Sequence, residues 1–144
     1  MESRKVAIIT DGTGPIQELA GNIAAIIGGA HGYSAALFQA ESFSGDDLLP
    51  AYVFFLGCIE AKPPSFHYIE DLFKHINLAG RSCGIFSSNA RALKYLSALV
   101  RDSETAVGKP FMIKGGATDS KKLQNWIQSI FKKGAQNERF QSGS

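Results

Sequence analysis

The sequence has no long hydrophobic run, although 44% of its 144 residues are hydrophobic. A helix that spans a membrane needs about 18 to 20 consecutive apolar residues, and no segment of the sequence is of this kind. Residues 1–5 lead directly into a short apolar segment, without the hydrophobic region and small-residue cleavage site of a secretory signal. We therefore expect one globular domain in the cytoplasm.

The sequence also contains few cysteines and histidines, and its net charge is small. The cysteines, Cys58 and Cys83, lie in apolar surroundings without metal-ligand spacing, which favours reduced buried thiols over a disulfide or a redox pair. The histidines, His31, His67 and His75, have no His or Cys partner at such a spacing, so we predict no metal site. The formal net charge of +2 gives no argument for a nucleic acid or a membrane as partner.

The sequence does contain a regular alternation of short apolar runs with segments of helical periodicity. The apolar runs predict five strands, at 5–10, 33–39, 51–57, 82–86 and 110–114. The helical spacing of apolar residues predicts helices at 16–28, 65–76, 89–100 and 120–132, with one helical turn at 46–49. We interpret residues 1–133 as a single domain and the polar residues 134–144 as a tail.

This alternation predicts an α/β fold in which helices cover both faces of a parallel sheet. The continuous hydrophobic run at 52–56 is typical of a central strand that is buried on both faces. We predict a three-layer sandwich with a five-stranded parallel sheet in the order 2-1-3-4-5. Ligands of such sheets bind beyond the carboxyl ends of the strands, where the loops 10–16, 57–65 and 87–91 meet.

The first of these loops has the character of an anion site. An apolar strand ends in the turn Thr10-Asp11-Gly12-Thr13-Gly14, and a helix follows at once. Free backbone N–H groups and the helix dipole converge at such a helix start, which favours a bound phosphate. The other interpretation of Gly14-Pro15 is an ordinary helix start with proline at its first position.

The chain resembles the flavodoxin family over about residues 4–132. The residues that carry the resemblance are the first strand and turn at 6–14, the strand end Phe54-Phe55-Leu56-Gly57, and the segment 84–88 before 93–96. The pattern is also similar to the flavodoxin-like domain of diflavin and flavo-diiron proteins. The resemblance implies a flavin mononucleotide (FMN) cofactor, with its phosphate in the first loop and its ring between the other two.

The resemblance further implies an electron carrier that performs no covalent chemistry of its own and meets a redox partner protein. The cofactor-binding residues implied are Thr10, Asp11, Gly12, Thr13, Gly14, Ile16, Gly57, Cys58, Ile59, Ser87, Ser88 and Asn89. In this role the backbone at 57–59 would tune the flavin potential, and no catalytic residue is expected.

The loops depart from the family pattern Ser/Thr-any-Thr-Gly-any-Thr, of which only Thr13 and Gly14 match. Asp11 brings a negative charge towards the phosphate, Pro15 lacks an N–H, and Ile16 lacks a hydroxyl. The loops 58–64 and 87–91 contain no aromatic residue that could stack on a flavin ring. We therefore expect FMN binding that is weaker than in ordinary flavodoxins.

Three other functions fit the same topology. A phosphoacceptor receiver would use Asp11, Ser87 or Ser88, and Lys114, but it needs an aspartate where this chain has Leu56-Gly57-Cys58. A low-molecular-weight phosphatase needs a cysteine and an arginine around the first loop, and both are missing there. The remaining alternative is an interaction or regulatory module that keeps the fold without flavin. The basic residues of the helix 89–100 and its end, Arg91, Lys94 and Arg101, would suit an acidic partner or simply face solvent.

Overall fold

The computed structural model describes residues 4–29, 32–113 and 119–142, with side chains as far as residue 132. Its strands are β1 (Arg4–Thr10), β2 (Tyr33–Gln39), β3 (Ala51–Gly57), β4 (Ser82–Ser87), β5 (Ala106–Val107) and β6 (Phe111–Met112). Its helices are α1 (Gly14–Gly28), α2 (Gly45–Leu48), α3 (His67–His75), α4 (Ala90–Arg101) and α5 (Ser120–Ser142), with a 3₁₀ turn at Pro64–Phe66 before α3. Among these elements no helix is both long and apolar enough to cross a membrane.

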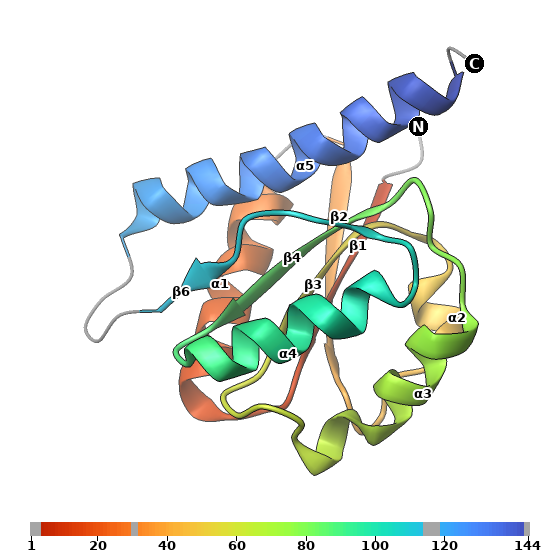
Figure 1. The fold of residues 1–144 in the computed structure, drawn as a ribbon. Coiled ribbons are helices and arrows are strands. Elements are labelled where there is room, and N and C mark those ends of the chain that lie inside the picture. Colours follow the sequence, from red (N-terminus) through yellow and green to blue (C-terminus); the bar gives the residue numbers. More distant parts are fainter. Residues whose placement is uncertain (1–3, 30–31, 114–118, 143–144) are drawn as a thin grey trace.

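The strands form one parallel sheet in the order β2-β1-β3-β4-β5, and β6 also pairs with β4 (Figure 1). The predicted α/β fold and strand order are therefore confirmed. Each connection between successive strands from β1 to β5 contains a helix and returns the chain to the end at which the strands begin, so that all of them run parallel.

The predicted fifth strand differs from the observed one. Instead of a continuous strand at 110–114, the chain makes two short strands, β5 and β6, that pair with opposite ends of β4. Between them, Gly108 donates its N–H to the Cys83 carbonyl at 3.1 Å, and Pro110 has no N–H to give to a ladder. The ladder is interrupted for this reason, and Lys114 lies outside the described residues.

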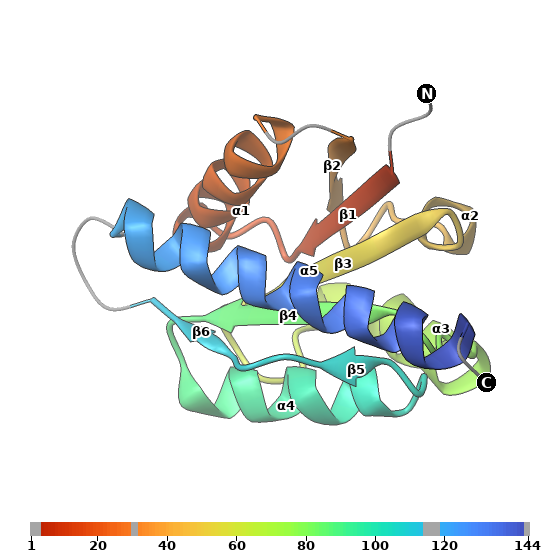
Figure 2. The same cartoon turned by 90° about the horizontal axis from the view of Figure 1, so that it is seen from above.

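Two hydrophobic cores lie on the two faces of the sheet, between it and the helices that Figure 2 shows from above. Helices α1 and α5 cover one face, and α3 and α4 cover the other. The strand β3 supplies side chains to both, because successive residues point to opposite faces. Val53 and Phe55 face α1 and α5, whereas Phe54 and Leu56 face α3 and α4, and all four are fully buried.

The helix ends differ in part from the prediction. The segment expected to be a helix at 65–76 begins as a 3₁₀ turn at Pro64 and becomes α-helical at His67. The last helix, expected to end near Lys132, continues to Ser142, so most of the segment assigned to the polar tail is helical. Among its residues with described side chains, Leu123, Trp126, Ile127 and Ile130 are buried against the sheet.

The crossing of α5 over the sheet depends on a glycine in β4. A Cβ atom at Gly84 would stand 2.7 Å from the Phe55 ring and 2.9 Å from the Trp126 ring, closer than packed carbon atoms allow. We expect Gly84→Ala to lower the free energy of unfolding by about 1 to 3 kcal/mol through overpacking. The matched control is Gly21→Ala in α1, where a Cβ meets nothing within 4 Å, and it should stabilise by about 0.5 to 1 kcal/mol. Urea unfolding of both variants tests this, and equal midpoints would contradict it.

Candidate functional site

The carboxyl ends of β1, β3 and β4 bring the three predicted loops together at one end of the strands, which we call the carboxyl edge of the sheet. In the register of the sheet Thr10 pairs with Gly57, and Gly57 pairs with Phe86. The loops that follow these strand ends are therefore neighbours, although they are far apart in sequence. The topology confirms this meeting place, which the strand order had predicted.

Asp11 is the centre of the hydrogen bonding between the first two loops. Its Oδ1 atom accepts from the Thr13 N–H at 3.1 Å and from the Thr13 hydroxyl at 2.7 Å. Its Oδ2 atom accepts from the Ile59 N–H at 2.8 Å, across 48 residues of sequence. A carboxylate with three donors is well satisfied, and the donors hold it at the start of α1. The first loop therefore does hold an anion, and this anion is the chain's own aspartate.

The backbone of the first loop is engaged in a similar way. The Gly12 N–H donates to the Thr10 hydroxyl oxygen at 3.3 Å, and that hydroxyl donates to the Gln17 side-chain oxygen at 2.7 Å. Gly12 has φ +81°, a conformation that favours glycine. Two of the three amides predicted for a phosphate, those of Gly12 and Thr13, thus bind side chains of the same loop.

The second and third loops are tied together through Ile59 and Asn89. The Asn89 side-chain nitrogen donates to the Ile59 carbonyl at 3.3 Å, while its Oδ1 accepts from the Arg91 N–H at 2.9 Å and caps α4. The Asn89 N–H in turn donates to the Ser87 hydroxyl at 3.1 Å. Because the Ile59 N–H is bound to Asp11, Ile59 is hydrogen-bonded to both neighbouring loops. We call this arrangement of Asp11, Ile59 and Asn89 the Ile59 junction.

The predicted site residues differ widely in exposure. Buried are Thr10, Ile16, Gly57, Cys58 and Ser87; half-buried are Asp11, Thr13, Ile59 and Asn89; exposed are Gly12, Gly14 and Ser88. Ile16 is fully buried among the side chains of α1 and α5. Its apolar side chain thus serves the core, because α1 turns this position inward. The absence of a hydroxyl at this position is therefore explained by packing.

Cys58 follows the buried end of β3. Its Sγ donates to the Glu60 carbonyl at 3.2 Å, and burial together with the nearby Asp11 carboxylate raises the pKa of the thiol to about 12. Burial also raises the pKa of the Cys83 thiol well above its usual value. Both cysteines are free and buried, which confirms the prediction of reduced thiols.

Two glutamines at this edge were absent from the predicted site. Gln17 lies on the first turn of α1 and accepts the hydroxyl hydrogen of Thr10. Gln39 ends β2, pairs with Thr10, and would contact a Cβ atom at Gly12 at 3.7 Å. Gln39 could have been predicted from the sequence, because the predicted strand order places the end of strand two beside the end of strand one. The first loop is thus flanked by two neutral amides.

The donors around Asp11 are N–H and hydroxyl groups, which are also the types of donor that bind a phosphate. A phosphate can use the Thr13 donors only if the Asp11 carboxylate moves away from them, because two anions cannot share these donors without repulsion. The same carboxylate would also release Ile59. Of the groups at this edge, Asp11 is thus the one that opposes a bound phosphate most directly.

Metal ligands do not gather in the part of the chain that the structure describes: no group of three His, Cys, Asp or Glu residues could hold an ion there. His31 lies outside the described residues. His75 donates from Nδ1 to the Asp71 carbonyl within α3, at 2.8 Å.

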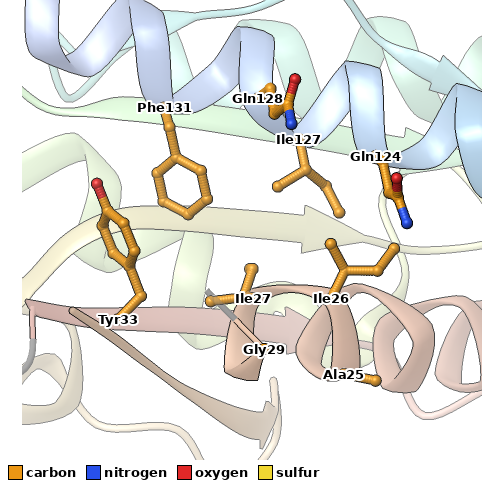
Figure 3. A pocket seen from close by; sticks show the side chains of 9 residues that line it. All are labelled: Ala25, Ile26, Ile27, Gly29, Tyr33, Gln124, Ile127, Gln128 and Phe131. Carbon is orange, nitrogen blue, oxygen red and sulfur yellow. The ribbon is translucent and has the colours of Figure 1, made fainter. Parts of the chain in front are cut away.

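A separate hollow of about 690 Å³ lies between α1 and α5, at the end of α1 opposite to the first loop (Figure 3). Its walls are mainly aliphatic and aromatic, with Tyr33 and Phe131 close together at one end, their ring centroids 4.6 Å apart. Gln124 and Gln128 add polar groups from α5. None of the predicted site residues lines this hollow, so it is distinct from the three loops.

Comparisons with known proteins agree with the topology. The chain has a TM-score of 0.79 to a short-chain flavodoxin associated with a PDU bacterial microcompartment, at 13% identity, covering 93% of this chain and 99% of that one. It has a TM-score of 0.73 to flavodoxin 2 from Bacillus cereus, at 17% identity, covering 90% and 99%. This chain has a flavodoxin-like fold.

A similar domain also occurs as part of a larger protein. The Flv1 flavodiiron core from Synechocystis sp. PCC6803 matches with a TM-score of 0.76 at 20% identity, over 94% of this chain and 37% of that one. No protein-family model and no curated protein sequence matches the chain. At these identities the likeness concerns the fold, and the loops must be interpreted from their own residues.

The burial of the two thiols leads to a test of the site's second loop. At pH 8 a thiol with a pKa of about 12 has roughly a thousandfold less thiolate than one with a pKa of 9. We expect the folded protein to react with Ellman's reagent far more slowly than the protein unfolded in guanidinium chloride, which should release both thiols at once. The variant Cys83→Ser isolates Cys58. Rapid reaction of its folded form would show that the loop at Cys58 opens to solvent.

Proposed function

We propose that this chain is a flavodoxin-like electron-transfer protein that binds FMN at the three loops, and that Asp11 competes with the FMN phosphate for the first loop. The observation that carries the proposal is the set of donors that holds the Asp11 carboxylate at the start of the 15-residue helix α1. This set supports an anion site in this loop, at the sheet edge where open α/β folds bind their ligands. The fold likeness to complete flavodoxins supports the same assignment.

The residues have separate roles in this proposal. The amides of Gly12, Thr13 and Gly14 and the Thr13 hydroxyl would bind the phosphate once Asp11 has turned away. The backbone of Gly57–Ile59 and the loop at Ser87–Asn89 would contact the ring. When bound, the flavin supplies electron transfer in one-electron or two-electron steps, and the protein orients it and leaves one edge open to a partner.

Two features weaken this binding. Displacing Asp11 breaks its bonds to Thr13 and Ile59, and each such bond to a charged group contributes about 1.5 to 3 kcal/mol. In the second and third loops, the described segments 58–64 and 87–91 contain no aromatic residue for stacking on the ring. The redox partner would then meet a site whose neighbouring helix α4 exposes the basic residues Arg91 and Lys94, which suits an acidic surface.

A second candidate function is also compatible with the Ile59 junction. This junction ties the three loops to one another through hydrogen bonds between the chain's own groups. A module that keeps the flavodoxin-like fold for interaction or regulation, and no longer binds flavin, would have this arrangement. The two candidates differ in what happens when the carboxylate is removed.

Titration with FMN distinguishes them. Asp11→Ser removes the competing charge, and we expect it to bind FMN roughly tenfold to a hundredfold more tightly than the wild type, equivalent to about 1 to 3 kcal/mol. Adding Pro15→Asn restores one N–H and should strengthen binding further, whereas Ile16 is left unchanged because it belongs to the core. Quenching of flavin fluorescence gives the dissociation constants. Asp71→Ser, an exposed carboxylate on α3, is the control and should bind as the wild type does.

Each outcome has a clear meaning. If no variant quenches FMN while circular dichroism shows all of them folded, the flavin-free module is the better description. If the wild type binds FMN at nanomolar affinity, Asp11 is not a competitor of the phosphate. A yellow protein from expression, with absorbance near 450 nm, would support the electron carrier directly.

A further inference from the structure

The two lateral edges of the sheet, which are formed by its outermost strands, differ in length. At one edge β5 and β6 have only two residues each, which offers little backbone for pairing. At the other edge lies β2, a strand of seven residues that pairs with β1 alone among the described strands. Figure 2 shows β2 at the end of the sheet, beside β1. The strands at one lateral edge are thus too short for extended pairing, whereas β2 at the other is long enough for it.

The hydrogen bonds of the flanking residues fix which backbone groups of β2 point outward. The Gly32 carbonyl accepts from Arg4 at 2.8 Å, and the Ala40 N–H donates to Thr10 at 2.8 Å, so residues 32 and 40 face β1. The N–H and C=O of one strand residue point to the same side, and successive residues alternate. Hence the even-numbered residues of β2 direct their N–H and C=O groups towards β1. The odd-numbered residues, Tyr33, Ala35, Leu37 and Gln39, direct their N–H and C=O groups away from the sheet.

This edge lacks the usual protection of an exposed strand. Natural edges are protected by charged side chains, by proline, by bulges or by short length. β2 has neither charge nor proline, its register with β1 is continuous over seven residues, and Leu37 is 44% exposed. Such an edge is a template for another strand.

The sequence of β2 is complementary to itself. We propose that β2 pairs antiparallel with β2 of a second copy of this chain, around a twofold axis at Ala36. Ala35 then lies opposite Leu37 of the partner subunit, and Ser34 lies opposite the partner's Phe38. In each pair a small residue faces a large one, and the absence of charge on β2 removes like-charge repulsion.

The backbone geometry agrees with this axis. With the axis at Ala36, residue 35 meets residue 37 and residue 33 meets residue 39, and all of these have outward-pointing groups. They form the hydrogen-bonded pairs of an antiparallel ladder, each exchanging two bonds. Residues 34, 36 and 38 form the non-hydrogen-bonded pairs, where side chains approach most closely.

A shallow hollow on the sheet surface lies beside these small residues of β2. It has a volume of about 230 Å³ and is lined by Ser34 and Ala36 of β2, with Lys5 and Ala7 of β1 and Asp47 of α2 among its other residues. Both Ser34 and Ala36 are exposed. The axis brings the partner's Phe38 to Ser34, on the face that carries this hollow. The pairing thus brings an aromatic ring beside the small side chain of Ser34 and leaves the three loops, at the carboxyl edge, open.

Directed disulfide formation tests the register. At a non-hydrogen-bonded pair the Cα atoms are about 4.5 Å apart, within the range of a disulfide. We expect Ala36→Cys to form a covalent dimer on mild oxidation, seen on a non-reducing gel. The matched control is Ser34→Cys, exposed on the same face, because the axis separates its two copies by several residues along the strands. The native thiols, Cys58 and Cys83, are buried and do not interfere.

Charge at the axis tests the same contact without oxidation. Light scattering should show a dimeric mass for the wild type, a monomeric mass for Ala36→Lys and for Ala36→Glu, and a dimeric mass when the two variants are mixed. A wild-type protein that stays monomeric at about 100 μM would overturn the proposal. So would equal crosslinking of the two cysteine variants, which would place the contact elsewhere. FMN binding plays no part in these readouts.

Discussion

The burial of β3 on both faces is the constraint on which the rest of the molecule depends. A strand with helices above and below it must be apolar at every position, and Val53, Phe54, Phe55 and Leu56 meet this demand with no exposed surface. Because β3 lies between β1 and β4, its register fixes where those two strands end. The loops therefore converge at one edge as a consequence of core packing, before any functional requirement applies.

At that edge a single carboxylate determines how the loops are joined. Asp11 takes donors from its own loop and from Ile59, and Asn89 completes the connection to the third loop. In water these donors would bind solvent, so the net gain of each bond is modest, but leaving them unpaired at this partly buried edge costs more. The loops are therefore joined through the chain's own groups, which are also of the kind that attract anions. Under the proposed function, FMN would therefore compete with Asp11 for these donors.

The loop edge and the β2 edge are independent in chemistry and in place. The loops lie at the carboxyl ends of the strands and act through N–H donors and one charge, whereas β2 presents an uncharged backbone along the side of the sheet. The pairing of two β2 strands would extend the sheet across two molecules and place the two loop sites at opposite ends, since the strands run antiparallel. An electron carrier of this form would expose two sites that do not obstruct each other.

Much of the fold could be predicted from the sequence, because it depends on local patterns. Apolar runs of about six residues, glycines after helices and the uninterrupted hydrophobic stretch of β3 sufficed for the sheet order and for most helices. Asp11, Pro15 and the loops without aromatics were also recognisable as departures from a phosphate and flavin site. Those statements rested on the resemblance to the flavodoxin pattern together with the chemistry of each residue type.

Tertiary structure decided what depends on distant partners. Ile16 belongs to the core because α1 rotates it inward, and Asp11 binds Ile59 because the register places residues 48 apart side by side. The split of the last strand arises where Gly108 bonds to Cys83 before Pro110 interrupts the ladder. The sequence thus determined the elements and their order, through periodicity and propensity. Which donors the first loop keeps for itself was decided only when the chain closed, since hydrogen-bond partners at the loops come from different strands.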